Sequence, residues 1–171
     1  LDAGQLEKAE KLLLQLEQQA PDNLYLLDSF ADLYIAKKQP EKAQEKLAYA
    51  FQLRPNNSVV TLNYANVAIE NKQNKKAIQL LEYYLLAKPN DYLATQLLSH
   101  AYKADKNKAK YHTTNAEYYA LSSNYRAAIK SADRALSHLS EEDKAEINRL
   151  EALKLKYRDR MNYIKKIKGA K

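Results

Sequence analysis

The sequence has no cysteine and no tryptophan, and it holds only two glycines and four prolines among its 171 residues. Without cysteine, neither a disulfide framework nor a thiolate metal site can form. The scarcity of glycine argues against most β-rich folds, which need glycine in their turns, whereas abundant Ala, Leu, Glu, Lys and Gln favours helix throughout. No apolar run approaches the length that spans a bilayer, so we expect a soluble chain with no membrane span.

Motifs of known catalytic sites are also missing. The three histidines are His100, His112 and His138, and no two of them stand at the i, i+4 spacing of an HExxH zinc site. Gly4 and Gly169 are the only glycines, so there is no glycine-rich phosphate loop. We therefore predict no catalytic residue, no metal site and no cofactor in this chain, and an enzyme is the least favoured class of function.

The net charge of +7 is concentrated at the C-terminal end. Residues 154–171 hold eight Lys or Arg and one Asp, whereas residues 1–153 hold twenty residues of each sign. A neutral body argues against a nucleic-acid footprint, so no nucleic-acid partner is predicted. For the basic tail two interpretations stay open. The favoured one is a solvated helix end, where cations suit the negative end of the helix dipole; the other is contact with anionic lipid or nucleic acid.

Internal periodicity is the strongest signal in the sequence. Three sets of residues recur every 34 positions: Pro21, Pro55 and Pro89; Ala9, Ala43 and Ala77; Leu13, Leu47 and Leu81. A 34-residue period with helical apolar spacing is typical of repeats made of two antiparallel helices. Neither helix of such a pair can bury its apolar stripe alone, so successive pairs must stack.

Small side chains mark the positions where these helices cross closely. They are Ala31, Ala65 and Ala116 on the first helix of a pair, and Ala43, Ala77 and Ala128 on the second. The recurring prolines end the second helices, because proline lacks an N–H group and disfavours helix in the residue before it. The pairs Asp22-Asn23, Asn56-Asn57 and Asn90-Asp91 can cap the helices that follow. Pro40 differs, since it suits the first turn of a helix.

The pattern predicts helices over residues 4–20, 23–37, 40–53, 57–71, 74–87, 91–104, 107–122, 124–138 and 141–167. The period slips by half a repeat near residues 105–111, because Tyr111 stands where an alanine is due and the pattern returns 17 residues displaced at Ala116 and Ala128. Helix 107–122 is therefore expected to complete one hairpin and to start the next.

The two ends of the chain are expected to differ from its middle. The last helix is predicted to begin at Ser140, with Glu141, Glu142 and Asp143 in its first turn, so residues 1–139 form the repeats and residues 140–171 a capping helix with a basic tail. The segment 1–4 resembles a helix tail and its turn, so we expect a fragment of a longer protein. A partial first repeat would expose the apolar side of helix 4–20, and this makes a homo-oligomer plausible.

Over residues 4–139 the residues that recur every 34 positions resemble those of the tetratricopeptide repeat family. The resemblance implies an all-α solenoid of antiparallel hairpins, about nine helices long, that binds another protein. The family's first-helix tryptophan is replaced by Leu27, Thr61 and Thr95, and its first-helix glycine by Ala31 and Ala65.

In that family the first helices line a peptide-binding groove. The matching positions here are Tyr25, Asp28, Asp32, Asn63, Asn66, Glu70, Gln96, His100 and Lys103, with Ser29, Val59, Leu93 and Leu97 beside them. Asn63 and Asn66 match asparagines that bond a bound peptide's backbone, which suits an amide that both donates and accepts. The lysines and arginines that clamp a C-terminal carboxylate in some members are replaced by Asp28, Leu93 and Leu97, so that clamp is not expected.

The C-terminal third is similar to a narrower group. The segment "HTTNAEYYALSSNYRAAIKSADRAL" and the Arg/Lys-rich last helix resemble the C-terminal repeat domain of periplasmic zinc metalloproteases that act in outer-membrane β-barrel assembly and quality control. The resemblance implies a periplasmic location, zinc only in an upstream domain, and unfolded outer-membrane proteins or the β-barrel assembly machinery as partners. The alternative is a scaffold of another envelope system, such as pilus biogenesis or polysaccharide secretion.

The 14 tyrosines allow two interpretations. Four of them fall at core positions of the repeat, which packing explains: Tyr34, Tyr64, Tyr119 and Tyr125. The others are either part of hairpin packing as well or form a ligand-facing cluster around residues 102–119, because tyrosine is enriched at interfaces.

Overall fold

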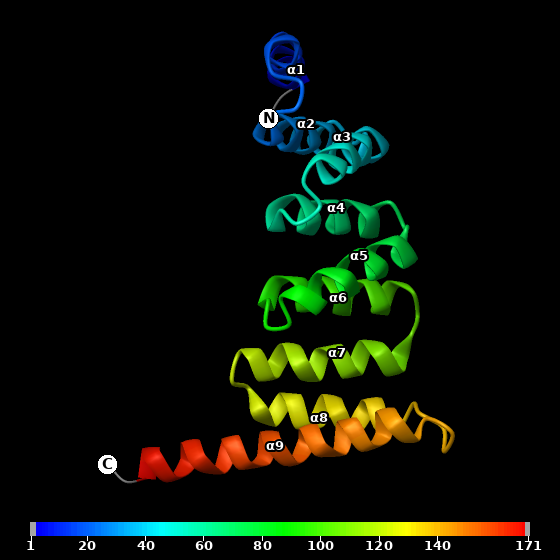
Figure 1. The fold of residues 1–171 in the computed structure, drawn as a ribbon, viewed down its shortest axis with the longest axis vertical. Coiled ribbons are helices and arrows are strands. Elements are labelled where there is room, and N and C mark those ends of the chain that lie inside the picture. Colours follow the sequence, from blue (N-terminus) through cyan, green and yellow to red (C-terminus); the bar gives the residue numbers. More distant parts are fainter. Residues whose placement is uncertain (1–2, 170–171) are drawn as a thin grey trace. The chain divides into compact units, whose positions relative to one another are not determined.

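The computed structural model describes residues 3–169, with side chains for residues 4–167, and all regular secondary structure in that range is α-helical (Figure 1). The helices are α1 (Ala3–Gln19), α2 (Leu24–Ala36), α3 (Pro40–Leu53), α4 (Ser58–Glu70), α5 (Asn74–Ala87), α6 (Tyr92–Ala104), α7 (Lys108–Leu121), α8 (Tyr125–Leu136) and α9 (Lys144–Gly169). The all-α prediction of about nine helices is confirmed for these residues.

The N-terminal turn expected at residues 1–4 is wrong in part. Ala3 and Gly4 already belong to α1, and Leu1 and Asp2 lie outside the described residues. Glycine is tolerated there because the cost of its backbone freedom is smallest near a helix end, where few helical hydrogen bonds depend on it.

The start of the last helix also differs from the prediction. It begins at Lys144, so Glu141 and Glu142 precede the helix and do not occupy its first turn. Asp143 directly precedes the helix, and its carboxylate accepts hydrogen bonds from the backbone N–H and the hydroxyl of Ser140, both at 2.8 Å, which closes the turn before α9. These bonds lower the pKa of the Asp143 carboxyl. At the other end α9 runs through Lys165 and Lys166 to Gly169, while the Lys171 of the expected tail lies outside the described residues.

The predicted caps are confirmed at three helix starts. The side-chain oxygens of Asn23, Asn57 and Asp91 accept hydrogen bonds from N–H groups in the first turns of α2, α4 and α6. Each bond satisfies one of the donors that a helix start leaves without a partner. Pro40 is the first residue of α3, where its missing N–H costs nothing.

A row of lysines occupies the turns between paired helices. Lys38, Lys72 and Lys106 have positive φ angles of 57°, 59° and 62°, and Ser123 has 59° at the corresponding turn after α7. Only glycine adopts this left-handed conformation without a steric penalty. The 34-residue period therefore extends to the backbone conformation of the turns. Lysine occupies this left-handed position in Lys38, Lys72 and Lys106.

Replacing one of these lysines by glycine should stabilise the protein. We expect Lys72→Gly to raise the free energy of unfolding by up to about 1 kcal/mol, because the relieved αL strain exceeds the extra backbone entropy of glycine in the unfolded chain. Urea unfolding followed by circular dichroism measures the change. The matched control is Lys75→Gly in the first turn of α5, which should lower stability by about 0.5 kcal/mol because glycine disfavours helix. A loss of stability in Lys72→Gly would contradict the strain argument.

The helices form two compact units, Leu1–Tyr84 and Leu85–Lys171, and α5 continues from the first into the second. In the first unit α1 packs against α2, α2 against α3, and α3 against α4. Its main core cluster joins Phe30 and Tyr34 of α2 with Leu47 of α3 and Tyr64 of α4. The apolar stripes of successive helices are thus buried against each other, as stacking of helix pairs requires.

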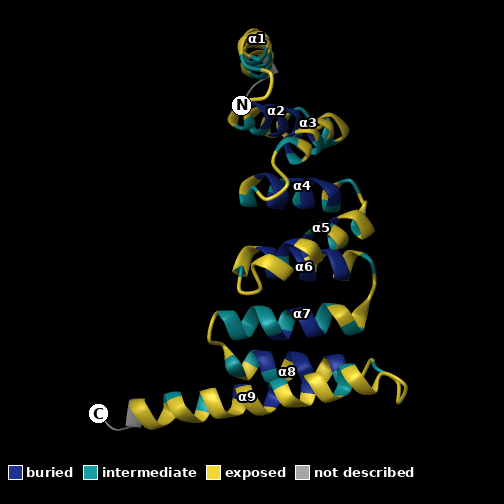
Figure 2. Ribbon diagram, in the orientation of Figure 1, coloured by how far each residue is buried: buried dark blue, intermediate teal, exposed yellow. Residues whose placement is uncertain are grey.

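In the second unit α7 packs against both α6 and α8, and α8 packs against α9. The core between α7, α8 and α9 is made of four alanines with Leu150 and Tyr157, all buried. Helix α9 is buried at only a few positions and exposed over most of its length (Figure 2).

The small residues lie where the repeat pattern places them. All six alanines predicted at close helix crossings are buried: Ala31, Ala43, Ala65, Ala77, Ala116 and Ala128. Two threonines replace the family's tryptophan without leaving a polar group unsatisfied. The hydroxyl of Thr61 donates to the carbonyl of Asn57 at 2.9 Å, and that of Thr95 to the carbonyl of Asp91 at 2.7 Å. A buried hydroxyl is tolerated because its own helix supplies the acceptor.

Candidate functional site

In the first unit, the predicted groove residues of α2 and α4 meet in one surface. The side-chain amide of Asn63 donates a hydrogen bond to the carboxylate of Asp28 at 2.6 Å, which joins the first helices of two successive repeats. Both side chains are half-buried. The bond uses one of the two N–H groups of the amide, and it confirms that these two positions share a face.

One turn further along each helix the same face continues. The amide of Asn66 donates to the carboxylate of its neighbour Glu70 at 3.1 Å. Asp32 lies on the same helix as Asp28. Partial burial raises the pKa of the Asp32 carboxyl, and the negative charge of Asp28 raises it further. Three carboxylates and two amides therefore line the surface, so it is rich in hydrogen-bond acceptors and carries negative charge.

Two exposed apolar side chains border this polar strip. Tyr25 begins α2 with 87% of its surface exposed, and Val59 begins α4 with 59% exposed. Neighbouring Ser29 turns back to its own helix and donates to the carbonyl of Tyr25 at 2.7 Å. We call the surface formed by Tyr25, Asp28, Asp32, Val59, Asn63, Asn66 and Glu70 the acidic face.

The predicted groove residues of α6 behave less uniformly. His100 and Lys103 are exposed, and Gln96 is half-buried, with its amide donating to the hydroxyl of Tyr118 on α7 at 3.2 Å. Leu97 is buried, so it belongs to the core of the second unit, and its assignment beside the groove is wrong. Leu93 is about half exposed. Some of the predicted groove residues of α6 are therefore exposed on the surface, and others are packed against neighbouring helices.

The tyrosines divide in the same way. Tyr84 and Tyr102 are buried, which favours packing for both, whereas Tyr83 and Tyr92 are exposed. The rings of Tyr92 and Tyr118 lie 4.6 Å apart, and the hydroxyl of Tyr92 donates to that of Tyr118. This contact holds the start of α6 against the end of α7.

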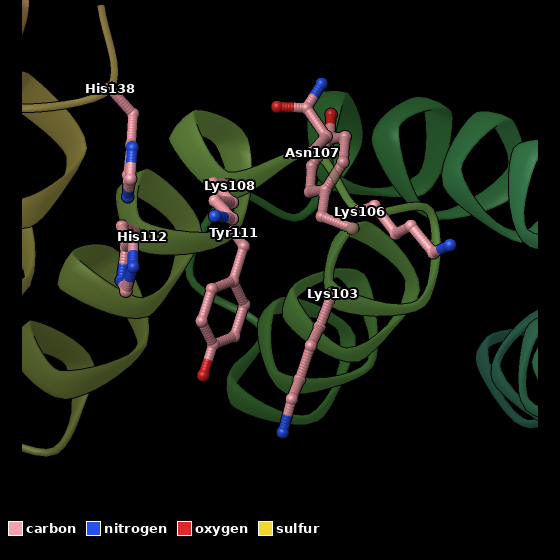
Figure 3. A pocket seen from close by; sticks show the side chains of 8 residues that line it. Lys103, Lys106, Asn107, Lys108, Tyr111, His112 and His138 are labelled. Carbon is pink, nitrogen blue, oxygen red and sulfur yellow. The ribbon is translucent and has the colours of Figure 1, made fainter.

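A separate pocket lies at the turn between α6 and α7. It has a volume of about 400 Å³ and is lined by Tyr102, Lys103, Lys106, Asn107, Lys108, Tyr111, His112 and His138. Figure 3 shows the rings of His112 and His138 lying one over the other, with the phenol of Tyr111 beside them and the side chain of Lys103 extending in the same direction as that phenol. We call this site the lysine pocket.

The histidine pair is defined by geometry and by charge. The two imidazole rings are stacked, with centroids 5.5 Å apart and planes 9° from parallel, and the ring of Tyr111 lies 4.8 Å from that of His112. Burial lowers the pKa of His112, and His138, Arg134 and Lys108 lower it further because they repel the imidazolium. The lowered pKa keeps His112 neutral at pH 7, and the lysines of the lining add positive charge to the pocket.

Comparison with known proteins identifies the repeats. A family model described as "Tetratricopeptide repeat" matches residues 34–101. The repeats of this segment thus resemble those of the tetratricopeptide family. Solved structures extend the likeness to most of the chain: MamA from Desulfovibrio magneticus RS-1 is 19% identical with a TM-score of 0.64, and the alignment covers 94% of this chain and 88% of MamA.

Other solved structures share the fold. Another MamA structure is 16% identical, with a TM-score of 0.65 and coverage of 95% of this chain and 92% of MamA. A tetratricopeptide repeat protein from Parabacteroides merdae is 15% identical, with a TM-score of 0.52 and coverage of 89% and 65%. The comparison with curated proteins finds no significant match. At these identities the likeness shows the fold, a tetratricopeptide-type helical solenoid, and this fold is typical of non-catalytic modules that bind other proteins.

Two negative findings apply to the described part of the chain. Nowhere within it do three or more His, Cys, Asp or Glu side chains gather closely enough to hold a metal ion. None of its helices combines the length and the apolar character that crossing a membrane requires.

Sequence reasoning pointed to Lys103 and to a tyrosine cluster around residues 102–119, but it missed the other lysines of the lysine pocket, because charge was averaged over the body of the chain. Between residues 103 and 110 there are four lysines and one aspartate, Asp105. This run joins the end of α6 to the start of α7, so a local charge count would have found it. No feature of the sequence predicted the contact between His112 and His138. It depends on the path of the chain after α8, which places His138 beside α7.

Proposed function

We propose that this chain is a polypeptide-binding module whose guest lies extended along the acidic face. The tetratricopeptide fold supports a protein-interaction role in general. The observation that carries the specific proposal is the hydrogen bond between Asp28 and Asn63, which places the amides and carboxylates of two successive repeats on one accessible surface.

The chemistry of the acidic face favours a particular kind of guest. The carboxylates of Asp28, Asp32 and Glu70 accept hydrogen bonds from backbone N–H groups and attract lysine or arginine side chains. The exposed ring of Tyr25 offers a large contact area at low entropic cost, which is typical of residues that dominate binding energy. A neutral or basic extended segment therefore fits, and an acidic one is repelled.

We further propose that the chain is the partner-binding domain of a periplasmic zinc metalloprotease that acts on outer-membrane β-barrel assembly and quality control. Support comes from the similarity of the C-terminal third to that group. Unfolded outer-membrane proteins are then the guests, and the β-barrel assembly machinery is a further partner. Self-association through the exposed Leu12, Leu14 and Leu16 of α1 stays a prediction that sedimentation analysis can check.

A matched pair of tyrosine variants tests the binding face. Tyr25→Ala removes an exposed ring from the acidic face, and Tyr83→Ala removes an exposed ring from α5, outside that face. Fluorescence anisotropy measures the affinity for a labelled, urea-unfolded outer-membrane β-barrel protein after dilution. We expect Tyr25→Ala to weaken binding at least about fivefold, because it removes the large contact area of the ring, and Tyr83→Ala to leave it unchanged.

Two outcomes would count against the proposal at different levels. If both variants bind like the unaltered chain, or if no polypeptide binds, the acidic face is not the binding surface. A second probe, reduced and carboxymethylated α-lactalbumin, separates the two levels. Equal binding of both probes supports a general polypeptide module and contradicts the narrower role in β-barrel assembly.

A further inference from the structure

The lysine pocket has a charge that its own surroundings do not balance. Lys103, Lys106 and Lys108 line it, and the lining contains no carboxylate. Within the described part of the chain none of these three lysines forms an ion pair, although elsewhere Lys37, Lys46 and Lys154 all do. An anion in the cavity would supply the counter-charge that the lining lacks.

The start of α7 adds to the same positive potential. This helix has 14 residues and begins at Lys108, inside the pocket lining. Asn107 already satisfies two N–H groups of the first turn, that of Lys110 with its side chain and that of Tyr111 with its carbonyl. The N–H groups of Lys108 and Ala109 belong to the same helix start, whose dipole favours a negative ligand beside it.

The donor set distinguishes between two kinds of anion. Arginine presents a planar fork that matches a carboxylate, and the pocket contains no arginine. Ammonium groups act as point charges that can approach a tetrahedral anion from several directions, and lysine is a common phosphate ligand for that reason. Three ammonium groups also match the two negative charges of a phosphate dianion better than they match the single charge of a carboxylate.

The aromatic side of the cavity suggests that the anion can carry an organic group. The stacked rings of His112 and His138, with Tyr111 beside them, form a flat wall next to the lysines (Figure 3). Because His112 is neutral at pH 7, it can also donate or accept a hydrogen bond. A small group esterified to a phosphate could lie against this wall.

We propose that the lysine pocket is a binding site for a phosphate monoester dianion, held by Lys103, Lys106 and Lys108 and flanked by the His112–His138 stack. The site is distinct from the acidic face, whose charge has the opposite sign. Its occupation does not depend on polypeptide binding, so the two proposals can fail separately.

Histidine NMR signals of the full chain test this proposal directly. Inorganic phosphate and glycerol 3-phosphate are titrated separately at pH 7.5 and constant ionic strength, with sodium acetate as the carboxylate comparison. We expect saturable shifts of the His112 and His138 ring signals with both phosphates, no shift of His100, and no saturation with acetate. Tighter binding of the ester indicates an organic phosphate as ligand, and equal binding indicates phosphate itself.

Charge-neutralising variants supply the second measurement. Lys103→Gln and Lys108→Gln should each weaken phosphate binding about tenfold, because each removes one charge-assisted hydrogen bond. Lys156→Gln, which removes an exposed lysine on α9, is the matched control and should bind like the unaltered chain. Circular dichroism checks that all three variants fold. The proposal is overturned if acetate saturates the site equally well, if no histidine signal shifts, or if all three variants bind phosphate alike.

Discussion

Replacing Phe30 by alanine should lower the free energy of unfolding of the first unit by about 3–5 kcal/mol, the range found when a buried phenylalanine is truncated. Phe30 is fully buried in the cluster that joins α2, α3 and α4. Its ring stacks on Tyr34 at 5.9 Å, and the ammonium of Lys46 lies 4.4 Å from its centroid. Truncation therefore opens a cavity and removes two ring contacts at once.

Amide hydrogen exchange of α2 and α3 measures this loss where it arises, so other parts of the chain do not obscure it. The matched control is Tyr25→Ala, which truncates an aromatic ring five residues earlier on the same helix at an exposed position. That control should change exchange by less than about 0.5 kcal/mol, as is usual for surface substitutions. Equal protection in Phe30→Ala and Tyr25→Ala would show that the α2–α3–α4 cluster does not hold the unit together.

The second large effect concerns the one lysine among the described residues that is buried. The ammonium of Lys154 on α9 lies 2.8 Å from a carboxylate oxygen of Asp133 on α8 and 2.9 Å from one of Glu151. The double variant Asp133→Asn, Glu151→Gln leaves a buried cation without a counter-charge. We expect it to lose about 2 kcal/mol, less than for a fully buried pair because both carboxylates are half exposed.

Removing the cation itself should cost much less. Lys154→Met keeps the length and the apolar stem of the side chain, and the two carboxylates it leaves behind remain in contact with water. We expect a change within about 1 kcal/mol, because replacing a buried charge by an apolar group is often close to neutral. Urea unfolding of both variants measures the difference. A Lys154→Met variant that is less stable than the double variant would show that the ion pairs, and not the avoidance of an unpaired charge, stabilise the contact between α8 and α9.

The pH dependence of the same comparison gives an independent check. The hydrogen bond to Asp133 raises the pKa of Lys154, with a smaller contribution from Glu151. A raised pKa in the folded state stabilises the protein below the unfolded-state pKa, near 10.5, and this stabilisation is lost as the pH rises through the folded value. The stability difference between the unaltered chain and Lys154→Met should therefore be constant at neutral pH and shift in favour of the variant only above about pH 10.

Much of the local structure follows from short-range rules that can be applied to the sequence. The 34-residue period located the helices, and the caps at Asn23, Asn57 and Asp91 followed from residue type and position alone. The start of α9 shows where such rules compete. Ser140 and Asp143 are both residue types that favour a helix start. The helix begins after Asp143, whose carboxylate bonds back to Ser140 and closes the turn before it.

Of the predicted groove residues, those of α2 and α4 lie on one surface, and their role in binding stays a prediction. Asp28 lies on α2 and Asn63 lies on α4. The hydrogen bond between their side chains shows that the two helices bring these positions together. Leu97 was misplaced because its exposure depends on the neighbour that covers α6. In the structure α7 packs against both α6 and α8, and Ala116 of α7 is buried.

The sequence by itself determined that this protein is helical, that its helices pair with a period of 34 residues, and that alanines mark their crossings. These properties depend on residue type and on spacing along one chain. The acidic face, the buried cation at Lys154 and the lysine pocket were decided only by the tertiary structure. Each of them brings together side chains that are far apart in sequence: Asp28 and Asn63 on the acidic face, Asp133 and Lys154 between α8 and α9, and His112 and His138 beside the lysine pocket. No periodicity within a single helix specifies such contacts.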